Sequence, residues 1–471
     1  MFVQQFFLKG IAHSSYLLGA RDACAIVDPR RDVDVYLDAA RDMGMRITHV
    51  LETHLHADFV SGHMDLAAKT GATIVAPKAG RCAFPHRAVA EGDTFEIEDL
   101  VVRVLETPGH TPEHVSYVVV DTARGPEPVC VFTGDTLFVG DVGRPDLFPG
   151  RAKELASKLY DSLHGKLMTL PDYCEALPAH GAGSLCGRSM GAKRTTTIGY
   201  ERLHNRALAV SDRGTFIESL TTNMPPSPDH FSRLSALNGA GPALVADLAP
   251  LAALAPKEFS ARAKDPGAVV LDVRAYDAFG GQHVPRAWHI DVGGNFSTFA
   301  GWVLPPDKDI LLVATNAAQA AEAALLLRRV GLDRAVAWLE GSMFEWAKAG
   351  LPTAHVPQIS PAELQYLAKS KLLAIVDVRA AGEFAKSHID GAVNIPAPDL
   401  RSRFAELRRD VPVVLVCSTG HRSSLAAGIL RQHGFDDVRN LAGGMTGYAA
   451  SGFAPECATC IGPHGPAFLG R

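Results

Sequence analysis

The stretch THLHADF, which ends at Phe59, contains the densest set of side chains that could bind a metal ion. His54, His56 and Asp58 alternate there with small or apolar residues, directly after the apolar run 47–51. Imidazole and carboxylate groups are common ligands of transition metals. Phe59 stands where a second metal ion would need another imidazole, and a phenyl ring has no ligand atom. The spacing therefore predicts one metal ion with open coordination positions rather than a pair of ions.

Three further motifs with potential metal ligands follow apolar runs in the same way. They are TPGHT with His110, TGDT with Asp135 and PAHG with His180. Each would lie in a loop at the end of a strand, and loops on one edge of a sheet can converge on a common site. We therefore expect the four motifs to meet.

The elements that would position these loops are short. From residue 1 to about 215, β-type apolar runs alternate with His- and Gly-rich loops, and helical patterns such as 33–43 and 153–163 follow some of them. This order predicts sheets with helices outside. Residues 223–243 are rich in Pro, Ser and Gly and indicate a linker or a wrapping segment.

The remainder of the chain contains an internal repeat. Matching pairs occur in the same order, at 270–274 and 375–379, at 310–314 and 413–417, and at 339–343 and 441–445. Each copy alternates strands and helices, which favours a small α/β domain. We predict three domains, residues 1–245, 246–355 and 356–471.

Length and composition exclude some classes of function. The 471 residues are enough for two to four domains. A net charge of −5 gives no support to nucleic-acid or anionic-membrane binding. No apolar run approaches the roughly 20 residues of a membrane span, and we expect no signal peptide. Eight scattered cysteines do not form a disulfide framework, so we expect a reducing cytoplasm. The oligomeric state stays open.

The four motifs, in this order and spacing, resemble the metallo-β-lactamase fold, an αββα sandwich, over residues 1–215. The departure at Phe59 resembles a branch with mononuclear Fe(II), the persulfide dioxygenases. Carried over by motif, the resemblance implies His54, His110 and Asp135 as iron ligands, a facial triad with three adjacent positions for O₂ and a substrate sulfur. It implies that groups behind the ligands orient them or the substrate, namely His56, Asp58 and His180.

Two other interpretations of this site stay open. Zinc accepts the same ligands, and thioester hydrolysis of the glyoxalase II type is the alternative reaction, with Phe59 as the feature against it. A non-catalytic sulfur carrier or sensor, in which the metal serves fold stability, is the alternative outside enzymology.

Two features near the motifs add to the resemblance. The run GDVGRPD resembles one that follows the ligand Asp in persulfide dioxygenases, and Arg144 and Asp146 within it could form a buried pair that fixes the loop. The loop after His180 resembles that of multidomain bacterial persulfide dioxygenase–sulfurtransferases. Cys186 lies there beside Arg188, and an adjacent cation lowers the pKa of a thiol. Cys186 could therefore handle a persulfide, and a small packed cysteine is the alternative.

Cys417 opens the loop CSTGHR between the apolar run 413–416 and a helical pattern from 425 to 433. A cysteine at a helix N-terminus meets backbone N–H groups that stabilise a thiolate or a persulfide anion. Arg422 adds a charge that could attract sulfite or thiosulfate. The loop resembles the Cys-x₄-Arg active loop of rhodaneses. Cysteine-dependent phosphatases use a longer Cys-x₅-Arg loop, so Arg422 comes one residue too early for them.

The first repeat lacks these groups. Ala314 stands where Cys417 would be and Gln319 where Arg422 would be, and a methyl group cannot carry sulfur. We predict a catalytically silent rhodanese-like domain that serves spacing, docking or dimerisation. Cys457 and Cys460 in the Gly/Pro-rich tail form a lone Cys-x-x-Cys, a weak signal for zinc or redox chemistry, and a non-catalytic tail is favoured.

The order of parts predicts a route for sulfur. The resemblance implies that the iron domain oxidises a low-molecular-weight thiol persulfide with O₂ to sulfite. Cys417 would take sulfane sulfur from another persulfide, and sulfite would then accept it and leave as thiosulfate. The expected partners are therefore the small molecules persulfide, O₂ and sulfite.

Overall fold

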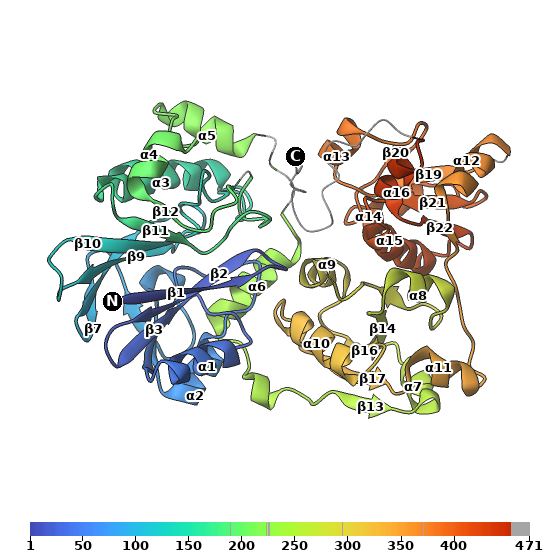
Figure 1. Cartoon of the computed structure of the whole chain (residues 1–471), viewed down its shortest axis with the longest axis horizontal. Coiled ribbons are helices and arrows are strands. Elements are labelled where there is room, and N and C mark those ends of the chain that lie inside the picture. Colours follow the sequence, from blue (N-terminus) through green and yellow to red (C-terminus); the bar gives the residue numbers. More distant parts are fainter. Residues whose placement is uncertain (189, 223, 225–226, 294, 371, 454–471) are drawn as a thin grey trace. The chain divides into compact units, whose positions relative to one another are not determined.

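The computed structural model describes residues 1–453 except 189, 223, 225–226, 294 and 371. The chain divides into two compact units. The first is Met1–Leu248 with Arg328–Gly331, and the second comprises the rest of the described chain. Both units are mixed α/β (Figure 1). Among the described residues, no helix combines the length and the apolar character that crossing a membrane would require.

The first unit contains two six-stranded sheets. One has the order β1(Phe2–Leu8), β2(His13–Gly19), β3(Ala23–Val27), β4(Arg46–Leu51), β5(Thr73–Pro77), β6(Arg87–Val89). The other has the order β12(Thr196–Thr197), β11(Glu175–Pro178), β10(Pro128–Gly134), β9(Val115–Asp121), β8(Leu100–Glu106), β7(Thr94–Ile97). The helices are α1(Asp34–Asp42), α2(His63–Thr70), α3(Ala152–Gly165), α4(Ile198–His204), α5(Arg213–Thr221) and α6(His230–Ala240).

The two sheets pack face to face around one apolar core. Tyr16 and Val27 from the first sheet and Val102, Tyr117 and Phe132 from the second belong to the same buried cluster. In β7, buried and exposed residues alternate, the pattern of a strand with one face on the core. Helices α1 and α2 cover the outer face of one sheet, while α3, α4 and α5 lie beside the other (Figure 1). The predicted αββα sandwich is confirmed.

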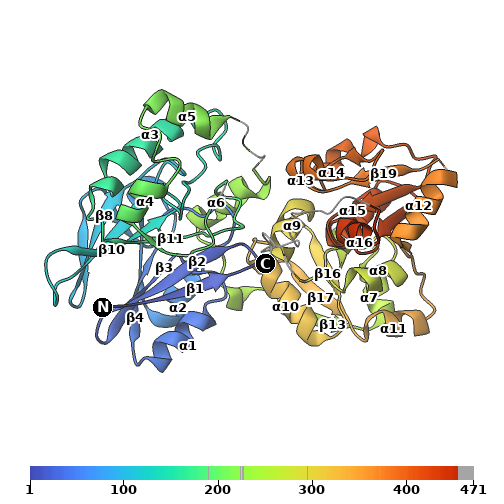
Figure 2. The same ribbon diagram turned by 45° about the horizontal axis from the view of Figure 1, so that its top comes forward.

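The second unit contains two five-stranded sheets of the same topology, and all their strand pairs are parallel. The first has the order β13(Ala252–Leu254), β17(Ala335–Leu339), β16(Asp309–Val313), β14(Ala268–Asp272), β15(Trp288–His289). The second has the order β18(Gln358–Ile359), β22(Val438–Leu441), β21(Val413–Val416), β19(Ala374–Asp377), β20(Val393–Asn394). Figure 2 shows both sheets with their helices. The internal repeat seen in the sequence is therefore two copies of one α/β fold.

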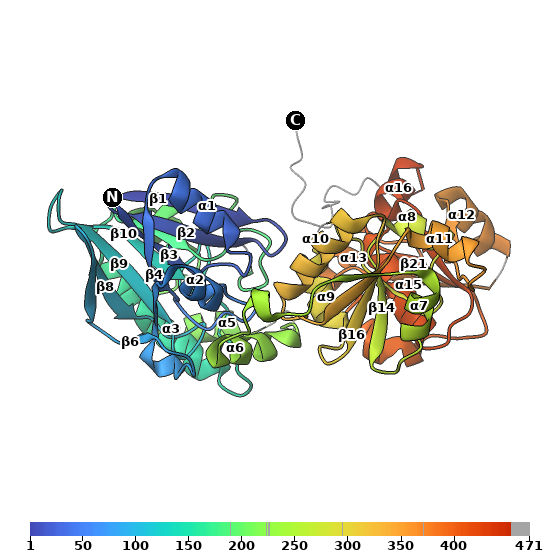
Figure 3. The ribbon, with the colours of Figure 1, turned by 90° about the horizontal axis from the view of Figure 1, so that it is seen from below.

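Helices lie on both faces of each of these sheets, as parallel strands require. In the first repeat they are α7(Pro256–Arg262), α8(Tyr276–Gly281), α9(Phe296–Val303), α10(Ala317–Arg328) and α11(Ser342–Lys348). In the second they are α12(Pro361–Ser370), α13(Ala381–Lys386), α14(Leu400–Arg403), α15(His421–Gln432) and α16(Gly444–Ala450). In the first repeat, α9 and α10 lie on one side of the sheet and α7 and α11 on the other (Figure 3).

A buried ion pair recurs in the two repeats. Arg274 binds Asp272 at 2.6 Å at the end of β14, and Arg379 binds Asp377 at 2.6 Å at the end of β19. In each repeat the aspartate also accepts the backbone N–H of its arginine, which closes the turn that leaves the strand. The matching DVR sequences therefore build the same turn twice.

Within the range 223–243, the described residues 227–243 pack on the first unit as a wrapping segment, the second of the two alternatives predicted. Helix α6 lies within this range, and it buries Phe231, Leu234 and Asn238. Asn238 Nδ2 donates to the carbonyl oxygens of His56 and Phe59, both at 2.8 Å. Asn238 Oδ1 accepts the backbone N–H of Ser61 at 2.9 Å. This single side chain therefore ties α6 to the loop after β4.

Candidate metal centre and sulfur-transfer loop

The structure brings His54, His110 and Asp135 together at one edge of the first unit. Their ligand atoms lie within 4.8 Å of one another, and all three side chains are buried. Asp135 Oδ2 is 3.8 Å from His54 Nε2 and 3.3 Å from His110 Nε2. The three residues follow the ends of β4, β8 and β10, so the convergence of loops expected from the sequence occurs.

Hydrogen bonds on the far side of each group leave one atom of each free for a metal ion. Thr53 Oγ1 donates to Asp28 and therefore accepts from His54 Nδ1 at 2.9 Å. His110 Nδ1 donates to the carbonyl oxygen of Arg144 at 2.9 Å. Both Nε2 atoms then carry a lone pair. His54 Nε2, His110 Nε2 and Asp135 Oδ2 are buried and have no hydrogen-bond partner. These three atoms could therefore bind one metal ion, with two nitrogen ligands and one oxygen ligand.

The charges of the three groups also suit a cation. Burial lowers the pKa of His54 and of His110, so both imidazoles are neutral. Burial raises the pKa of Asp135, but the charge and the hydrogen bond of His180 outweigh burial, and the pKa lies well below its ordinary value. Neutral imidazoles and an ionised carboxylate are the protonation states that metal binding requires.

His180 connects Asp135 to Asp58. His180 Nδ1 lies 2.7 Å from Asp135 Oδ1, and His180 Nε2 lies 2.8 Å from Asp58 Oδ2. Burial lowers the pKa of His180, but the two carboxylates outweigh burial and raise it well above its ordinary value. His180 therefore orients the carboxylate of Asp135, and Asp58 holds the other side of the His180 ring.

His56 points away from the candidate ligands. Its Nε2 atom lies 3.1 Å from Asp28 Oδ1 and 3.7 Å from Glu52 Oε2. The ring of Phe59 packs on His56 with 4.4 Å between centroids. The predicted set of two imidazoles and one carboxylate thus stands apart from His56, which belongs to a buried ion-pair cluster instead.

Cys417 lies in the second repeat, directly after β21 and before α15. Its side chain is buried. The backbone N–H of Gly420 donates to Cys417 Sγ at 3.1 Å, and Ser423 Oγ donates to the same sulfur at 3.2 Å. Two donors and the N-terminus of a helix therefore surround the sulfur, an arrangement that stabilises a negative charge there.

Comparisons with known proteins identify the family of each part of the chain. Residues 8–180 match the metallo-beta-lactamase superfamily, and residues 255–349 and 360–451 match the rhodanese-like domain. The metallo-beta-lactamase of Staphylococcus aureus subsp. aureus COL has a TM-score of 0.64 and 32% identity, covering 72% of this chain and 98% of that one. This chain belongs to the metallo-β-lactamase superfamily. It is a metallo-β-lactamase domain followed by two rhodanese-like domains, as the motifs predicted.

Relatives of two activities match the metallo-β-lactamase domain. Hydroxyacylglutathione hydrolase of Rhodospirillum rubrum is 40% identical over 154 residues, which are 32% of this chain and 55% of that protein. The mitochondrial persulfide dioxygenase ETHE1 of Mus musculus is 30% identical over 187 residues, 38% of this chain and 68% of that protein. The chain therefore spans about half the length of the hydrolase and two thirds of the dioxygenase.

Cys186 does not have the environment expected for it. Its thiol is buried, and burial, followed by the charges of Asp58 and Asp135, raises its pKa well above the ordinary value. Arg188 Nη1 donates to the carbonyl oxygen of Ser219 at 2.6 Å. The expectation that Arg188 lowers the pKa of Cys186 is therefore wrong, because the guanidinium is held by backbone carbonyls. Cys186 packs with Ala57, Phe138 and Phe231 in a small apolar cluster.

The Arg144–Asp146 pair exists and supports a candidate ligand. Arg144 Nε and Nη2 donate to Asp146 Oδ1 and Oδ2 at 2.7 and 2.8 Å. Because the carbonyl oxygen of Arg144 accepts from His110 Nδ1, the pair holds the backbone that orients His110.

Arg422 is not a free charge that awaits an anion. Arg422 Nη1 and Nη2 donate to the two carboxylate oxygens of Glu383 at 2.7 and 2.8 Å, and Nη2 also donates to Ser418 Oγ at 2.7 Å. Glu383 therefore neutralises the charge of Arg422 that the sequence predicted would attract sulfite or thiosulfate. The side chain instead holds the loop at Ser418, next to Cys417.

In the structure, Ala314 and Gln319 of the first repeat stand where the sequence placed them relative to Cys417 and Arg422. Ala314 follows β16 as Cys417 follows β21, and the two strands have equivalent partners, β14 and β19. Gln319 Oε1 accepts the backbone N–H of Thr315 at 2.7 Å, so this side chain closes the loop without a charge. Cys457 and Cys460 lie outside the described residues.

Several residues around the metal centre carried no signal in the sequence. His114 stacks on His54 with 4.9 Å between ring centroids, and its Nε2 accepts the backbone N–H of Asp135 at 2.9 Å. His13 in β2 packs on Phe59 with 4.1 Å between centroids. Neither histidine lies in a motif with the other candidate residues, so only the fold shows that they belong to the site.

A cavity of about 400 Å³ lies beside the metal centre. Leu55, Ala57 and Thr111 line it, and each is adjacent in sequence to one of the site's histidines. Phe231 and other residues of α6 line its far wall. The cavity is therefore lined by the loops that carry the candidate ligands, and its volume is that of a small-molecule site.

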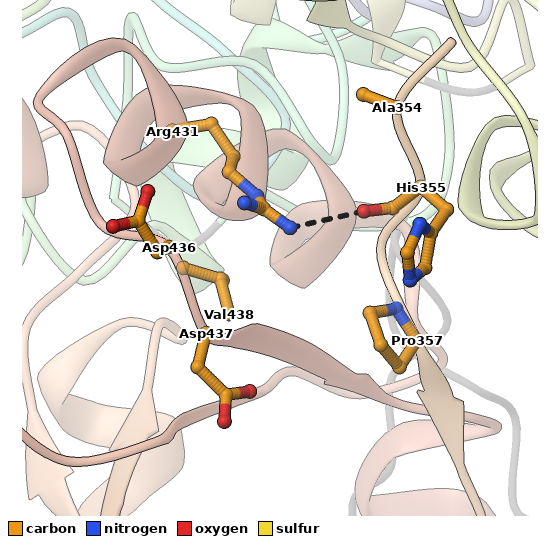
Figure 4. A pocket seen from close by; sticks show the side chains of 7 residues that line it. All are labelled: Ala354, His355, Pro357, Arg431, Asp436, Asp437 and Val438. Atoms are coloured by element: carbon orange, nitrogen blue, oxygen red, sulfur yellow. Dashed lines mark hydrogen bonds between the residues drawn. The ribbon is translucent and has the colours of Figure 1, made fainter.

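A second hollow, of about 320 Å³, lies in the second unit and carries no chemistry of this kind (Figure 4). Its lining residues are Ala354, His355, Pro357, Arg431, Asp436, Asp437 and Val438. Figure 4 shows Arg431 donating to the carbonyl oxygen of His355, a bond of 3.0 Å. No thiol lines this hollow, so it is separate from the Cys417 loop.

Proposed function

We propose that this metallo-β-lactamase–rhodanese fusion oxidises a low-molecular-weight thiol persulfide with O₂ to sulfite at a single Fe(II) ion, and forms thiosulfate through Cys417. One observation supports the first reaction best: the ligand atoms of His54, His110 and Asp135 lie within 4.8 Å of one another, while His56 Nε2 lies 3.1 Å from Asp28 Oδ1. The similarity to persulfide dioxygenase ETHE1 supports it further.

The proposed oxidation is RSSH + O₂ + H₂O → RSH + SO₃²⁻ + 2H⁺. The outer sulfur of the persulfide loses four electrons, and O₂ takes them up. When bound, Fe(II) would supply redox chemistry toward O₂, and a triad of protein ligands leaves adjacent coordination positions open. The residues of the chain position the reactants: the cavity beside Leu55 and Ala57 holds the thiol arm, and His180 fixes the carboxylate of Asp135.

The proposed sulfur transfer takes two steps at Cys417. The thiolate attacks the outer sulfur of a persulfide, so an S–S bond forms on Cys417 while RSH leaves. Sulfite then attacks the outer sulfur of the loaded cysteine, forms thiosulfate and releases the thiolate. The donors from Gly420 and Ser423 stabilise the negative charge on Cys417 Sγ at the start and end of this cycle.

A second candidate function is hydrolysis of a glutathione thioester at zinc. The observation in its favour is the 40% identity to the hydroxyacylglutathione hydrolase of Rhodospirillum rubrum. Phe59 is against it, because a buried phenyl ring occupies the position where a second metal would need an imidazole. As compartment we propose the reducing cytoplasm, because the described cysteines are all free thiols.

Metal analysis and an oxygen electrode distinguish the two candidates. We expect about one equivalent of iron per chain and O₂ uptake on addition of glutathione persulfide. His54→Ala should abolish the uptake, because it removes one of three ligands. The exposed His204→Ala is the matched control and should leave uptake unchanged. Two zinc ions with hydrolysis of S-lactoylglutathione and no O₂ uptake would establish the second candidate instead.

A further inference from the structure

Three side chains of the silent first repeat contact the sulfur-transfer loop of the second repeat or the first turn of α15. The ring of Tyr276 packs against Gly420, Asp291 faces His421, and His289 contacts Ser424. All six residues belong to the second unit, within which the two repeats pack together. The first repeat thus contacts the second at Gly420, His421 and Ser424.

Tyr276 contacts the residue whose N–H binds the reactive sulfur. Gly420 has φ +109°, a conformation that side chains rarely adopt, and a Cβ there would lie 3.0 Å from Cζ of Tyr276. The tyrosine ring therefore lies flush against the backbone of Gly420. The same Gly420 donates its N–H to Cys417 Sγ at 3.1 Å. Any movement of the ring away from Gly420 would relax this donor.

Asp291 binds the next residue of the loop. Asp291 Oδ2 lies 3.2 Å from His421 Nδ1. His421 is the first residue of α15 and precedes Arg422, which the Glu383 carboxylate holds from the other side. The loop is therefore held between an acid of the first repeat and an acid of the second.

His289 fixes the first turn of α15. Its Nε2 atom lies 2.9 Å from the carbonyl oxygen of Arg274, which can only accept, so Nε2 carries the proton. Nδ1 then accepts the hydroxyl hydrogen of Ser424 at 2.8 Å. The neighbouring Ser423 donates to Cys417 Sγ. Both donors on the sulfur thus lie next to residues that the first repeat holds.

We propose that the first repeat is a positioning element of the sulfurtransferase site, and that Tyr276, Asp291 and His289 hold the Gly420 and Ser423 donors on Cys417. The inference rests on the proposed sulfur transfer at Cys417 and gives the silent repeat a task other than spacing, docking or dimerisation. Because these residues act on the loop and not on the substrate, their loss should lower kcat and leave KM nearly unchanged.

The test measures thiosulfate formation from glutathione persulfide and added sulfite, with the full chain and without O₂. Tyr276→Ala and Asp291→Ala should each lower kcat by about tenfold and change KM less than about twofold. Tyr276→Phe, which keeps the ring, and Asp291→Asn, which keeps an acceptor oxygen, should restore most of kcat. Amide exchange of residues 418–424 should be faster in the alanine variants only.

Matched controls on the same repeat are Phe344→Ala and Asp307→Asn, both at exposed positions. Wild-type kcat in Tyr276→Ala and Asp291→Ala would overturn the inference while sulfur transfer by the wild type stands. Absence of transfer by the wild type would instead overturn the proposed function. If Tyr276→Ala unfolds, the variants of the partly exposed Asp291 still test the inference. A loss of kcat in Asp291→Ala that Asp291→Asn does not restore would contradict positioning by this contact.

Discussion

At the scale of single residues, Phe59 shapes the metal centre by packing as well as by lacking a ligand atom. Its ring contacts the imidazoles of both His13 and His56, with 4.1 and 4.4 Å between centroids. The ring therefore packs on His56 while Asp28 binds the Nε2 atom of the same imidazole at 3.1 Å. Phe59 thus offers no ligand to a second ion, and its ring also packs on the His56 imidazole that lies against Asp28.

Phe59→His should supply an imidazole next to Asp58 and His180. We expect the variant, reconstituted with zinc, to bind a second equivalent of metal, as measured by elemental analysis after gel filtration. Phe59→Leu removes the ring without adding a ligand atom and should keep the wild-type stoichiometry. A single equivalent in Phe59→His would mean that Phe59 is not the sole determinant of nuclearity.

Residue types and spacing predicted the groups that meet at each site, but not the partners that orient them. His54, His110 and Asp135 could be found because each lies in a motif after an apolar run. Glu383 could not be found, because it lies 39 residues from Arg422 in the sequence and only the fold joins them. The pKa of Cys186 was also mispredicted, since adjacency to Arg188 in sequence says nothing about where the guanidinium points.

At the scale of elements, the loop from β10 to α3 depends on close backbone approach. A Cβ at Gly143 would overlap the carbonyl oxygen of Asp135 and lie 3.0 Å from Cβ of His110. Two candidate metal ligands therefore lie against Gly143, where a side chain would not fit. The sequence motif around Gly143 could be predicted to matter, but the reason for glycine appears only in the packed loop.

Gly143→Ala should displace Asp135 or His110 and lower the metal content of the protein severalfold. Overpacking of this kind costs about 1–3 kcal/mol of unfolding free energy, which urea denaturation would measure. Gly125→Ala is the matched control, because no atom lies within 4 Å of a Cβ placed at Gly125. Full metal content in Gly143→Ala would contradict this prediction, because it would show that the loop accommodates the methyl group without displacing Asp135 or His110.

The sulfur-transfer loop depends on an ion pair between α13 and α15. Burial raises the pKa of Glu383, but the hydrogen bonds and charge of Arg422 outweigh burial, and the pKa lies below its ordinary value. A carboxylate with a lowered pKa stabilises the folded state at pH values above its unfolded pKa, and this contribution is lost as the pH falls through the lowered pKa. The pair should therefore be intact throughout the neutral range.

Glu383→Gln should remove the charge that holds Arg422 and lower the rate of sulfur transfer by about tenfold, since removing one partner of a partly buried pair leaves the other without its counter-charge. O₂ uptake by the metallo-β-lactamase domain should not change. The wild type should show no acidic limb from this group above the ordinary glutamate pKa of about 4.3. pH–rate profiles of the wild type and of Glu383→Gln test this, and identical profiles would contradict a function of the ion pair in the loop.

Helix α6 shows why some elements escape prediction. Its segment is rich in Pro, Ser and Gly, which favour loops. Its buried residues Phe231, Leu234 and Asn238 nevertheless share one face, and Asn238 binds three backbone groups of the loop after β4. Tertiary contacts with that loop, rather than local propensity, therefore stabilise the helix.

At the scale of the whole chain, the repeat was the strongest signal in the sequence. Matching runs at constant order predicted two copies of one α/β fold, and the two sheets have equivalent strand orders. The fold of each part could be predicted because strands and turns repeat. The contacts of Tyr276 and Asp291 with the Cys417 loop could not, because they depend on how two copies pack within one unit.

Joining two active sites in one chain should matter for the product, because sulfite released at one site meets a loaded cysteine at high effective concentration. Cys417→Ser should keep O₂ uptake and release sulfite in place of thiosulfate. A mixture of Cys417→Ser with His54→Ala contains one working copy of each site on separate chains. Thiosulfate yield from this mixture should fall on dilution, whereas the yield from the wild type should not. Ion chromatography of sulfite and thiosulfate over a hundredfold range of protein concentration measures both, and equal dilution curves would show that sulfite leaves for bulk solution before it is used.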